Sequence, residues 1–255
     1  MSARRPLILA LLASAAALAA GGTADGRAGI RGRAAPAVLS MIVGSHGEVL
    51  APARVVTAGA GSVRVAGRSC AVAAGTPLAV LVARRHAGGP AFTLRDYGRC
   101  GASPASSAAL FVNSLAGQVN RGQDGWVYKV GGLIGSTGAA DPSGPQGDGR
   151  RLRSGARVVW FWCHSAAGGC QRTLELNAPA TVARGGAVSV RVLGRDNEGR
   201  AVPVAGAIVR LGSGFASTAA DGRAMLVAPT GAGRFQLTAE RAGLVPSFPV
   251  PLAVE

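Results

Sequence analysis

Residues 125–132 read Gly-Trp-Val-Tyr-Lys-Val-Gly-Gly, and residues 159–163 read Val-Trp-Phe-Trp-Cys. These two stretches hold all three tryptophans and one of the two tyrosines of a chain in which aromatic residues make up only 4%. Successive side chains of a β-strand point to opposite faces, so the alternation predicts two strands that each place their large rings on one face. The sequence therefore predicts a sheet in which the large rings are concentrated.

The candidate ligand-binding residues are Trp126, Tyr128, Trp160 and Trp162. An aromatic face is rigid and apolar, and it could stack against sugar rings or a flat macrocycle. The alternative is that these rings fill the space between the sheet and a helix, where large rings contribute most to a small core. Apolar Val127, Val159 and Phe161 lie between them, so both faces of the sheet are apolar and one of them must be buried.

The N-terminus has the features of a secretory signal peptide. Two arginines, at positions 4 and 5, precede an uncharged run from Pro6 to Ala20 that ends in small residues. A membrane anchor is the alternative, but a spanning helix needs about 20 apolar residues and this run is shorter. We expect residues 1–20 to be removed, residues 21–35 to form a flexible leader, and no transmembrane segment to remain. The mature protein is then expected to be secreted, or extracellular and associated with the cell wall.

Four cysteines remain after the signal peptide: Cys70, Cys100, Cys163 and Cys170. An even number in an oxidising compartment predicts two disulfide bonds. Of the three pairings that four cysteines allow, we prefer Cys163–Cys170, across a Gly168-Gly169 turn, together with Cys70–Cys100. A metal site of Cys163, His164 and Cys170 is the alternative, but it lacks a paired C-x-x-C and a second histidine at ligand spacing. We therefore expect disulfides, no metal and no cofactor.

Residues 36–171 are expected to form a small mixed sheet with one packed helix, an α+β arrangement. The helix is predicted to begin at Thr76, with Pro77 in its first turn, and to end at Gly88-Gly89. Before the aromatic segments, strands are predicted near residues 38–43, 53–56, 62–65, 91–94 and 109–113. A stretch from Gly138 to Gly149, rich in turn-forming residues, is predicted to be a loop beside the aromatic sheet.

Residues 172–255 contain no cysteine and no tryptophan, and their pattern is different. Alternation predicts strands at residues 187–192, 207–211, 223–227 and 234–239. Turn signals such as Asp221-Gly222 fall between these runs at the spacing of a β-sandwich. The whole chain is thus predicted to be mostly β, with an α+β domain that has one helix, followed by a C-terminal β-sandwich.

The aromatic segments, together with Leu152-Arg-Ser-Gly-Ala-Arg157 and the helix start at Gly75-Thr-Pro-Leu78, resemble a known exported module. The resemblance covers residues 61–165 and is to a bacterial domain related to the C-terminal β-domain of transcobalamin and intrinsic factor. It implies a β-grasp-like fold. Two positions depart from the family pattern: Gly131 stands where Asn is usual, and Ala156 where Asp is usual. Related animal domains close over cobalamin together with a helical domain, and this sequence contains no such helical partner.

Residues 172–255 resemble bacterial immunoglobulin-like or carboxypeptidase-regulatory-like modules. The similar segments are Val202–Val209 and the Thr218-Ala-Ala-Asp-Gly-Arg-Ala224 turn. Such modules are commonly spacers and parts of adhesins, so the resemblance implies a sandwich with a mechanical or adhesive role.

The chain is strongly basic, with a formal net charge of +15, which becomes +13 once the two arginines of the signal peptide are removed. The positive charge favours anionic partners such as teichoic acids, acidic glycans or lipid head groups. Nucleic acid is not an expected partner, because the arginines are scattered and the compartment is wrong.

Catalytic motifs are missing from the sequence: there is no G-x-S-x-G, H-E-x-x-H or phosphate-binding G-x-x-x-x-G-K. We therefore do not expect an enzyme, although a secreted hydrolase is a third reading. We expect a non-catalytic binding or adhesion module whose ligand is extracellular, such as a cell-wall glycan or an anionic polymer. The alternative is a structural component of the cell envelope that is held by anionic wall polymers.

Overall fold

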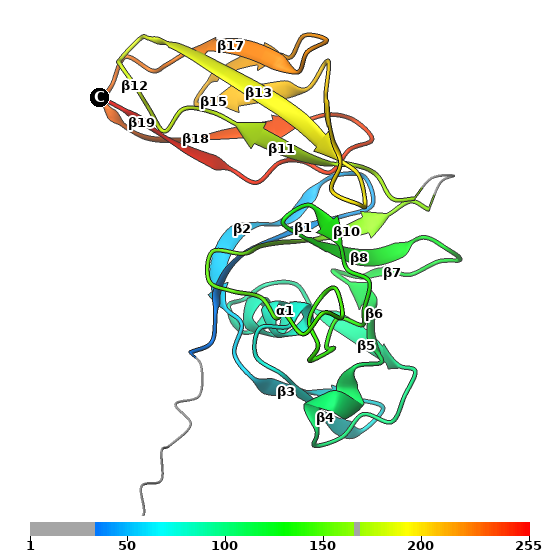
Figure 1. Cartoon of the computed structure of the whole chain (residues 1–255). Helices are drawn as coiled ribbons and strands as arrows, with labels where there is room; N and C mark the ends of the chain where they lie inside the picture. Colours follow the sequence, from blue (N-terminus) through cyan, green and yellow to red (C-terminus); the bar gives the residue numbers. More distant parts are fainter. Residues whose placement is uncertain (1–33, 166–168) are drawn as a thin grey trace, which may run out of the picture. The chain divides into compact units, whose positions relative to one another are not determined.

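The computed structural model describes residues 34–165 and 169–255. The predicted signal peptide lies outside the described residues, as does the predicted leader up to residue 33. From Ala34 to Glu255 the chain belongs to one unit by its internal contacts. We refer to residues 34–171 as the N-terminal lobe and to residues 172–255 as the C-terminal sandwich. The described residues are mostly β with one α-helix, which confirms the predicted fold class (Figure 1).

The N-terminal lobe is built on a five-stranded sheet in the order β2-β1-β10-β8-β9. Its strands are β1 (Ala37–Val43), β2 (Val49–Thr57), β8 (Gly125–Val130), β9 (Leu133–Ile134) and β10 (Arg157–Cys163). Strands β1 and β10 run parallel, and the other pairs are antiparallel. Two smaller sheets complete the lobe: the hairpin of β3 (Gly61–Val65) and β4 (Arg68–Val72), and the sheet of β5 (Phe92–Asp96), β6 (Leu110–Leu115) and β7 (Gln118–Val119).

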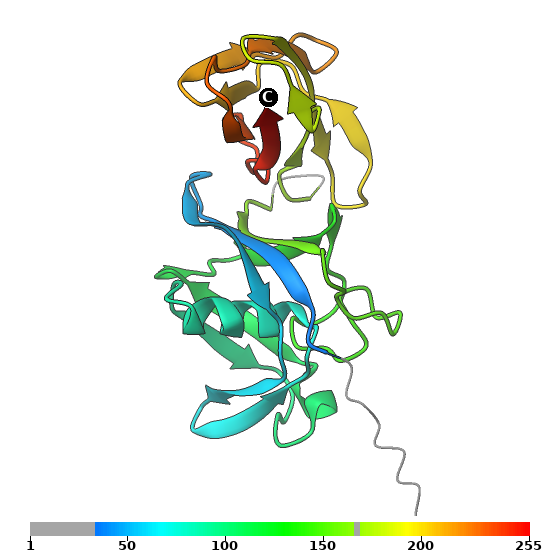
Figure 2. The ribbon, with the colours of Figure 1, turned by 90° about the vertical axis from the view of Figure 1, so that its left-hand side faces the viewer.

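The helix α1 (Pro77–His86) lies against β1 and β2, and Figure 2 shows it beside these strands. Thr76 caps it, because its hydroxyl accepts a hydrogen bond from the Ala79 N–H at 3.2 Å. The helix ends at His86, two residues before Gly88, whose φ of 82° suits the left-handed turn that follows. Gly89 must lack a side chain, because a Cβ there would lie 2.6 Å from the Arg84 carbonyl oxygen. The predicted helix is confirmed at both ends.

The two disulfides pair as preferred from the sequence, Cys70 with Cys100 and Cys163 with Cys170. The first joins β4 to the loop after β5, and the second joins the end of β10 to the residues that precede the C-terminal sandwich. The metal alternative is wrong, because both of its cysteines are bonded to each other.

The C-terminal sandwich consists of two sheets. One contains β11 (Thr173–Asn177), β13 (Ala187–Arg195), β14 (Ala201–Pro203) and β17 (Arg223–Val227). The other contains β12 (Thr181–Val182), β15 (Ile208–Leu211), β16 (Gly214–Ser217), β18 (Gly233–Glu240) and β19 (Val250–Val254). Alternation decides which side chains face inward: in β13, Val188, Val190 and Val192 are buried, whereas Ser189 and Arg191 are exposed.

The central strand β10 is buried on both faces. Its even-numbered residues 158, 160 and 162 join the core that includes α1, whereas Val159 and Phe161 belong to a second cluster with Val245, against which Phe248 packs. Residues of the C-terminal sandwich therefore cover the face of the sheet that the helix does not cover. This explains why residues 158–163 of β10 are apolar without interruption.

Lys129 of β8 lies on this second face and is 1% exposed. Its amine donates to the carbonyl oxygen of Arg195 at 3.1 Å, at the end of β13, and to that of Asp196 at 3.0 Å, in the turn that follows. It also lies 5.7 Å from the centroid of the Phe161 ring. Burial lowers the pKa of the Lys129 amine to about 8.

Candidate functional site

The four aromatic residues selected from the sequence are all in the core. Their exposed fractions are 7% for Trp126, 5% for Tyr128, 1% for Trp160 and 7% for Trp162. Trp126 and Trp162 pack edge to face, and the Trp126 indole N–H donates to the Gln118 carbonyl oxygen at 2.8 Å. The Tyr128 hydroxyl donates to the Thr137 carbonyl oxygen, and burial raises the pKa of this phenol. This placement favours the alternative in which the rings fill the core, and it leaves little ring surface for stacking a ligand.

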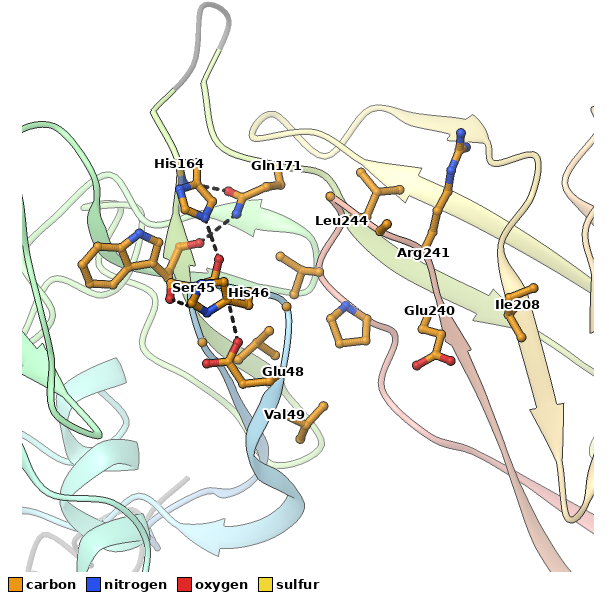
Figure 3. A pocket seen from close by; sticks show the side chains of 18 of the residues that line it. Ser45, His46, Glu48, Val49, His164, Gln171, Ile208, Glu240, Arg241 and Leu244 are labelled. Atoms are coloured by element: carbon orange, nitrogen blue, oxygen red, sulfur yellow. Dashed lines mark hydrogen bonds between the residues drawn. The ribbon is translucent and has the colours of Figure 1, made fainter.

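The described residues form an open cleft of about 760 Å³ next to these rings (Figure 3). Four segments line it: the loop between β1 and β2, the residues around the Cys163–Cys170 disulfide, the start of β15 with the turn before it, and the loop that follows β18. The volume lies within the range of about 300–1,000 Å³ that is usual for ligand pockets.

A network of hydrogen bonds fixes the conformation of the loop between β1 and β2. The Glu48 carboxylate accepts from the His46 N–H at 2.8 Å and from the Gln118 side-chain amide at 2.8 Å. Burial opposes ionisation of Glu48, but hydrogen bonds from its own backbone, Gln118 and His46 together hold its pKa below the ordinary value. Gln118 also accepts from the Ser45 N–H at 2.9 Å. Because each of these bonds fixes the backbone, the His46 side chain is presented from a fixed turn.

His164 links this loop to the end of β10. Its Nε2 lies 2.7 Å from the Ser45 carbonyl oxygen, so Nε2 donates, while Nδ1 lies 3.4 Å from the Asp124 carboxylate. The hydrogen bond from the Ser165 N–H, followed by the His164 contact, holds the pKa of Asp124 below its ordinary value. Gln171 fixes the same segment, since it accepts from the His164 N–H and donates to the Trp162 carbonyl oxygen.

The opposite wall of the cleft comes from the C-terminal sandwich. Leu244, Val245 and Pro246 supply its apolar part, and Arg241 lies exposed at its rim. Figure 3 shows Arg241 facing away from the hydrogen-bonded loop. Within the described residues Arg241 forms no ion pair, whereas neighbouring Glu240 is paired with Arg210 at 2.8 Å. The cleft thus combines an apolar wall with the exposed His46 imidazole on one side and the Arg241 guanidinium at its outer rim.

The polar side chains of the cleft mostly contact one another and the backbone. The ring nitrogen Nε2 of His164 is directed at a backbone carbonyl and not at a hydroxyl, and the Ser45 hydroxyl contacts the neighbouring His46 at 3.2 Å. Among the residues that the structure describes, no group of three His, Cys, Asp or Glu side chains could hold a metal ion. What the arrangement offers a ligand is hydrogen-bond donors beside an apolar surface.

The sequence analysis considered His164 only as a member of the metal alternative and did not connect it with the turn that holds His46. The contact of His164 with the Ser45 carbonyl cannot be seen in the sequence, because the two residues are far apart along the chain. Only the parallel pairing of β1 with β10 brings them together. A signal was present in Gly44-Ser-His-Gly47, a glycine-flanked histidine turn directly after an apolar strand.

Compared with models of protein families, with curated proteins and with solved structures, the chain matched none. Its function is therefore inferred from its own residues.

Proposed function

We propose that this chain is an exported, non-catalytic binding protein whose ligand occupies the cleft between the β1–β2 loop and the loop after β18. The ligand is a polar extracellular molecule with hydrogen-bond acceptors, of which a cell-wall glycan fragment is the best example. The transcobalamin-like and immunoglobulin-like resemblances are part of the proposal, since both describe modules that bind or present.

The single observation that carries the proposal is the composition of the cleft. Its apolar floor is flanked by the His46 imidazole on one side, and the exposed guanidinium of Arg241 lies at the outer rim of the other side. The Glu48 carboxylate accepts from two donors and the His164 ring contacts Ser45 and Asp124, so the groups that remain available are mainly the donors of His46 and Arg241. Oxygen-rich ligands such as oligosaccharides supply the matching acceptors.

Export is supported by the disulfides. Every cysteine among the described residues is in a disulfide, which is typical of proteins in oxidising compartments. None of the helices in the described part of the chain has the length and apolar character needed to cross a membrane.

The test is a calorimetric titration of the purified protein with soluble glycan fragments released enzymatically from bacterial cell wall. We expect the Arg241→Ala variant to bind at least about tenfold more weakly than the wild type, because it loses a charged donor at the cleft edge. Arg234→Ala is the matched control: this exposed arginine lies on β18, the strand that leads to Arg241, but does not line the cleft. Equal binding by all three proteins, or no binding by the wild type, would contradict the proposal.

The second candidate, a structural envelope component held by anionic polymers, is favoured by the charge balance. The chain has 27 Lys and Arg residues against 12 Asp and Glu residues. In the described residues, Arg68, Arg150, Arg195, Arg200, Arg210 and Arg223 form ion pairs with carboxylates. The excess positive charge would attract an anionic polymer, and the attraction would weaken with salt.

A further inference from the structure

Two exposed rings lie on the small sheet β5-β6-β7, away from the cleft and from the four buried rings. Tyr97 is 69% exposed and Phe111 is 47% exposed, and their ring centroids are 5.3 Å apart at an interplanar angle of 78°. This edge-to-face arrangement is a favourable one for aromatic pairs, so each ring restricts the other. Two rings that pack on each other while staying open to solvent form a surface, unlike a single exposed ring.

The register of the sheet places one arginine beside the rings, and the loop that follows carries a second. Arg95 lies directly opposite Phe111 on the neighbouring strand, so both side chains point to the same face. Tyr97 follows two residues later on that face, and its N–H still pairs with the Ala109 carbonyl oxygen at 3.1 Å. Arg99 lies two residues after Tyr97 in the loop and is also exposed. We call Arg95, Tyr97, Arg99 and Phe111 the ring–arginine surface.

The arginines of this surface are free to meet a ligand. Neither Arg95 nor Arg99 forms an ion pair within the described residues. The one carboxylate between them, that of Asp96, points inward, where its side chain is 3% exposed and binds Arg68 at 2.8 Å. The hydrogen bond from the Cys100 N–H, together with those from Gly98 and the charge of Arg68, holds the pKa of Asp96 below its ordinary value. The Asp96 carboxylate therefore stays ionised and remains bound to Arg68 and to the loop backbone, so it does not neutralise Arg95 or Arg99.

The loop that carries Tyr97 and Arg99 is fixed before any ligand arrives. Cys100 is bonded to Cys70 of β4, and the Asp96 carboxylate accepts from the N–H groups of Gly98 and Cys100 at 2.9 and 3.0 Å. At Gly98 a Cβ would lie 3.1 Å from the Ala109 Cβ, so glycine allows the loop to approach β6 closely. A surface ordered in advance loses little side-chain and loop entropy on binding.

We propose that the ring–arginine surface is a second binding site, and that it binds an acidic polysaccharide. The apolar face of a pyranose ring stacks on an exposed aromatic ring, and a uronic-acid carboxylate matches the fork of donors on a guanidinium. An acidic peptide would satisfy the arginines but would not require two ordered rings. The site adds to the function proposed for the cleft and does not depend on it, because no residue is shared between the two.

The test uses polygalacturonate, with its methyl ester as the uncharged counterpart and polyglutamate as a charged polymer without sugar rings. We expect the wild type to bind polygalacturonate about tenfold or more tightly than either of the other two, because only it offers both rings and carboxylates. The Tyr97→Ala, Phe111→Ala double variant should lose about tenfold in affinity for polygalacturonate. The Arg95→Ala, Arg99→Ala double variant should bind polygalacturonate more weakly than the wild type, and its affinity should change less with ionic strength.

Phe215→Ala is the matched control, because Phe215 is also 69% exposed but has Arg210 beside it, which is paired with Glu240. Its affinity should equal that of the wild type. The conservative Tyr97→Phe variant keeps the ring pair and should bind within about twofold of the wild type, which separates loss of the surface from loss of folding. Arg241→Ala changes only the cleft, so the two sites are distinguishable: loss of polygalacturonate binding in this variant, with unchanged binding by the ring variant, would place the polymer in the cleft and overturn the inference. Polyglutamate binding equal to that of polygalacturonate, or unchanged binding by the ring variant, would overturn the inference.

Discussion

The N-terminal lobe and the C-terminal sandwich reach a packed core by different means. The lobe holds both disulfides and all three tryptophans, and the largest side chain that is fully buried in the described residues is that of Trp160. The sandwich core consists of Val, Leu and Ala, with residues such as Val209 and Leu237 at 0% exposure and no cross-link. Irregular loops and small sheets need large rings and cross-links, whereas two regular sheets need only alternating aliphatic residues.

The largest expected effect comes from the core of the lobe. Trp160→Ala should lower the free energy of unfolding by about 4 kcal/mol, because it removes a fully buried ring and leaves a cavity. Denaturant titration followed by tryptophan fluorescence reports the lobe, where Trp126 and Trp162 remain. Leu237→Ala in the sandwich is the counterpart, at about 3 kcal/mol. A larger loss for Leu237→Ala would reverse the comparison.

Next in size is the loss of a cross-link. Removing Cys70–Cys100, which closes a loop of 30 residues, should cost about 3.5 kcal/mol, and removing Cys163–Cys170, which closes 7 residues, about 2.5 kcal/mol. The difference arises because a longer loop has more conformational freedom in the unfolded chain. Double Cys→Ala variants measured by thermal unfolding test the order. The prediction fails if the shorter loop proves the more important.

Lys129 lies where the two regions meet, and its amine should make the free energy of unfolding depend on pH. Because the folded-state pKa, about 8, lies below the ordinary value of 10.5, the unfolded chain binds more protons between these values. The contribution of Lys129 to stability is therefore lowest below pH 8 and rises by about 3 kcal/mol as the pH increases to 10.5.

The measurement for Lys129 is the free energy of unfolding of the wild type and of Lys129→Met at pH 7.5, 8.5 and 9.5. The wild type should gain stability relative to the variant across this range. Methionine has a similar length but no charge, so the variant should lack this slope. Parallel pH profiles for the two proteins would show that the amine is not buried as described.

The smallest expected effect is the stability lost when a buried threonine hydroxyl is removed, and one threonine in each region allows the comparison. The hydroxyl of Thr76 donates to Ala73 and accepts from Ala79, and that of Thr218 donates to Val204 and accepts from Ala207. Each Thr→Val change removes both bonds in a buried site, and each should cost about 2 kcal/mol. Similar losses would show that local polar networks matter equally in both regions. A negligible loss at either position would argue against its hydrogen bonds.

Much of the fold could be predicted from the sequence, because its signals are local. The alternation in residues 187–192, 223–227 and 234–239 predicted β13, β17 and β18, and Thr76-Pro77 predicted the start of α1. Short strands such as β7, β9 and β12 were missed, since two residues carry no periodicity. Their pairing depends on neighbours that are distant along the chain.

The candidate site was much less predictable. The sequence pointed to Trp126 and Trp160 because they are large and cluster in alternating segments, and both proved to be buried. Tyr97 and Phe111 attracted no attention because they are isolated in the sequence. Only the pairing of β5 with β6 brings them together.

By itself, the sequence determined the alternating strands, the capped helix and a choice of cysteine pairing, because each depends on residue type and spacing over a few positions. Only the tertiary structure decided which rings meet solvent. Val245 and Phe248 cover the face of β10 that carries Phe161, while Tyr97 remains 69% exposed with Phe111 packed against its ring. The physical reason is that burial is a property of contacts between distant segments, and one face of a strand looks the same in sequence whether or not another layer lies on it.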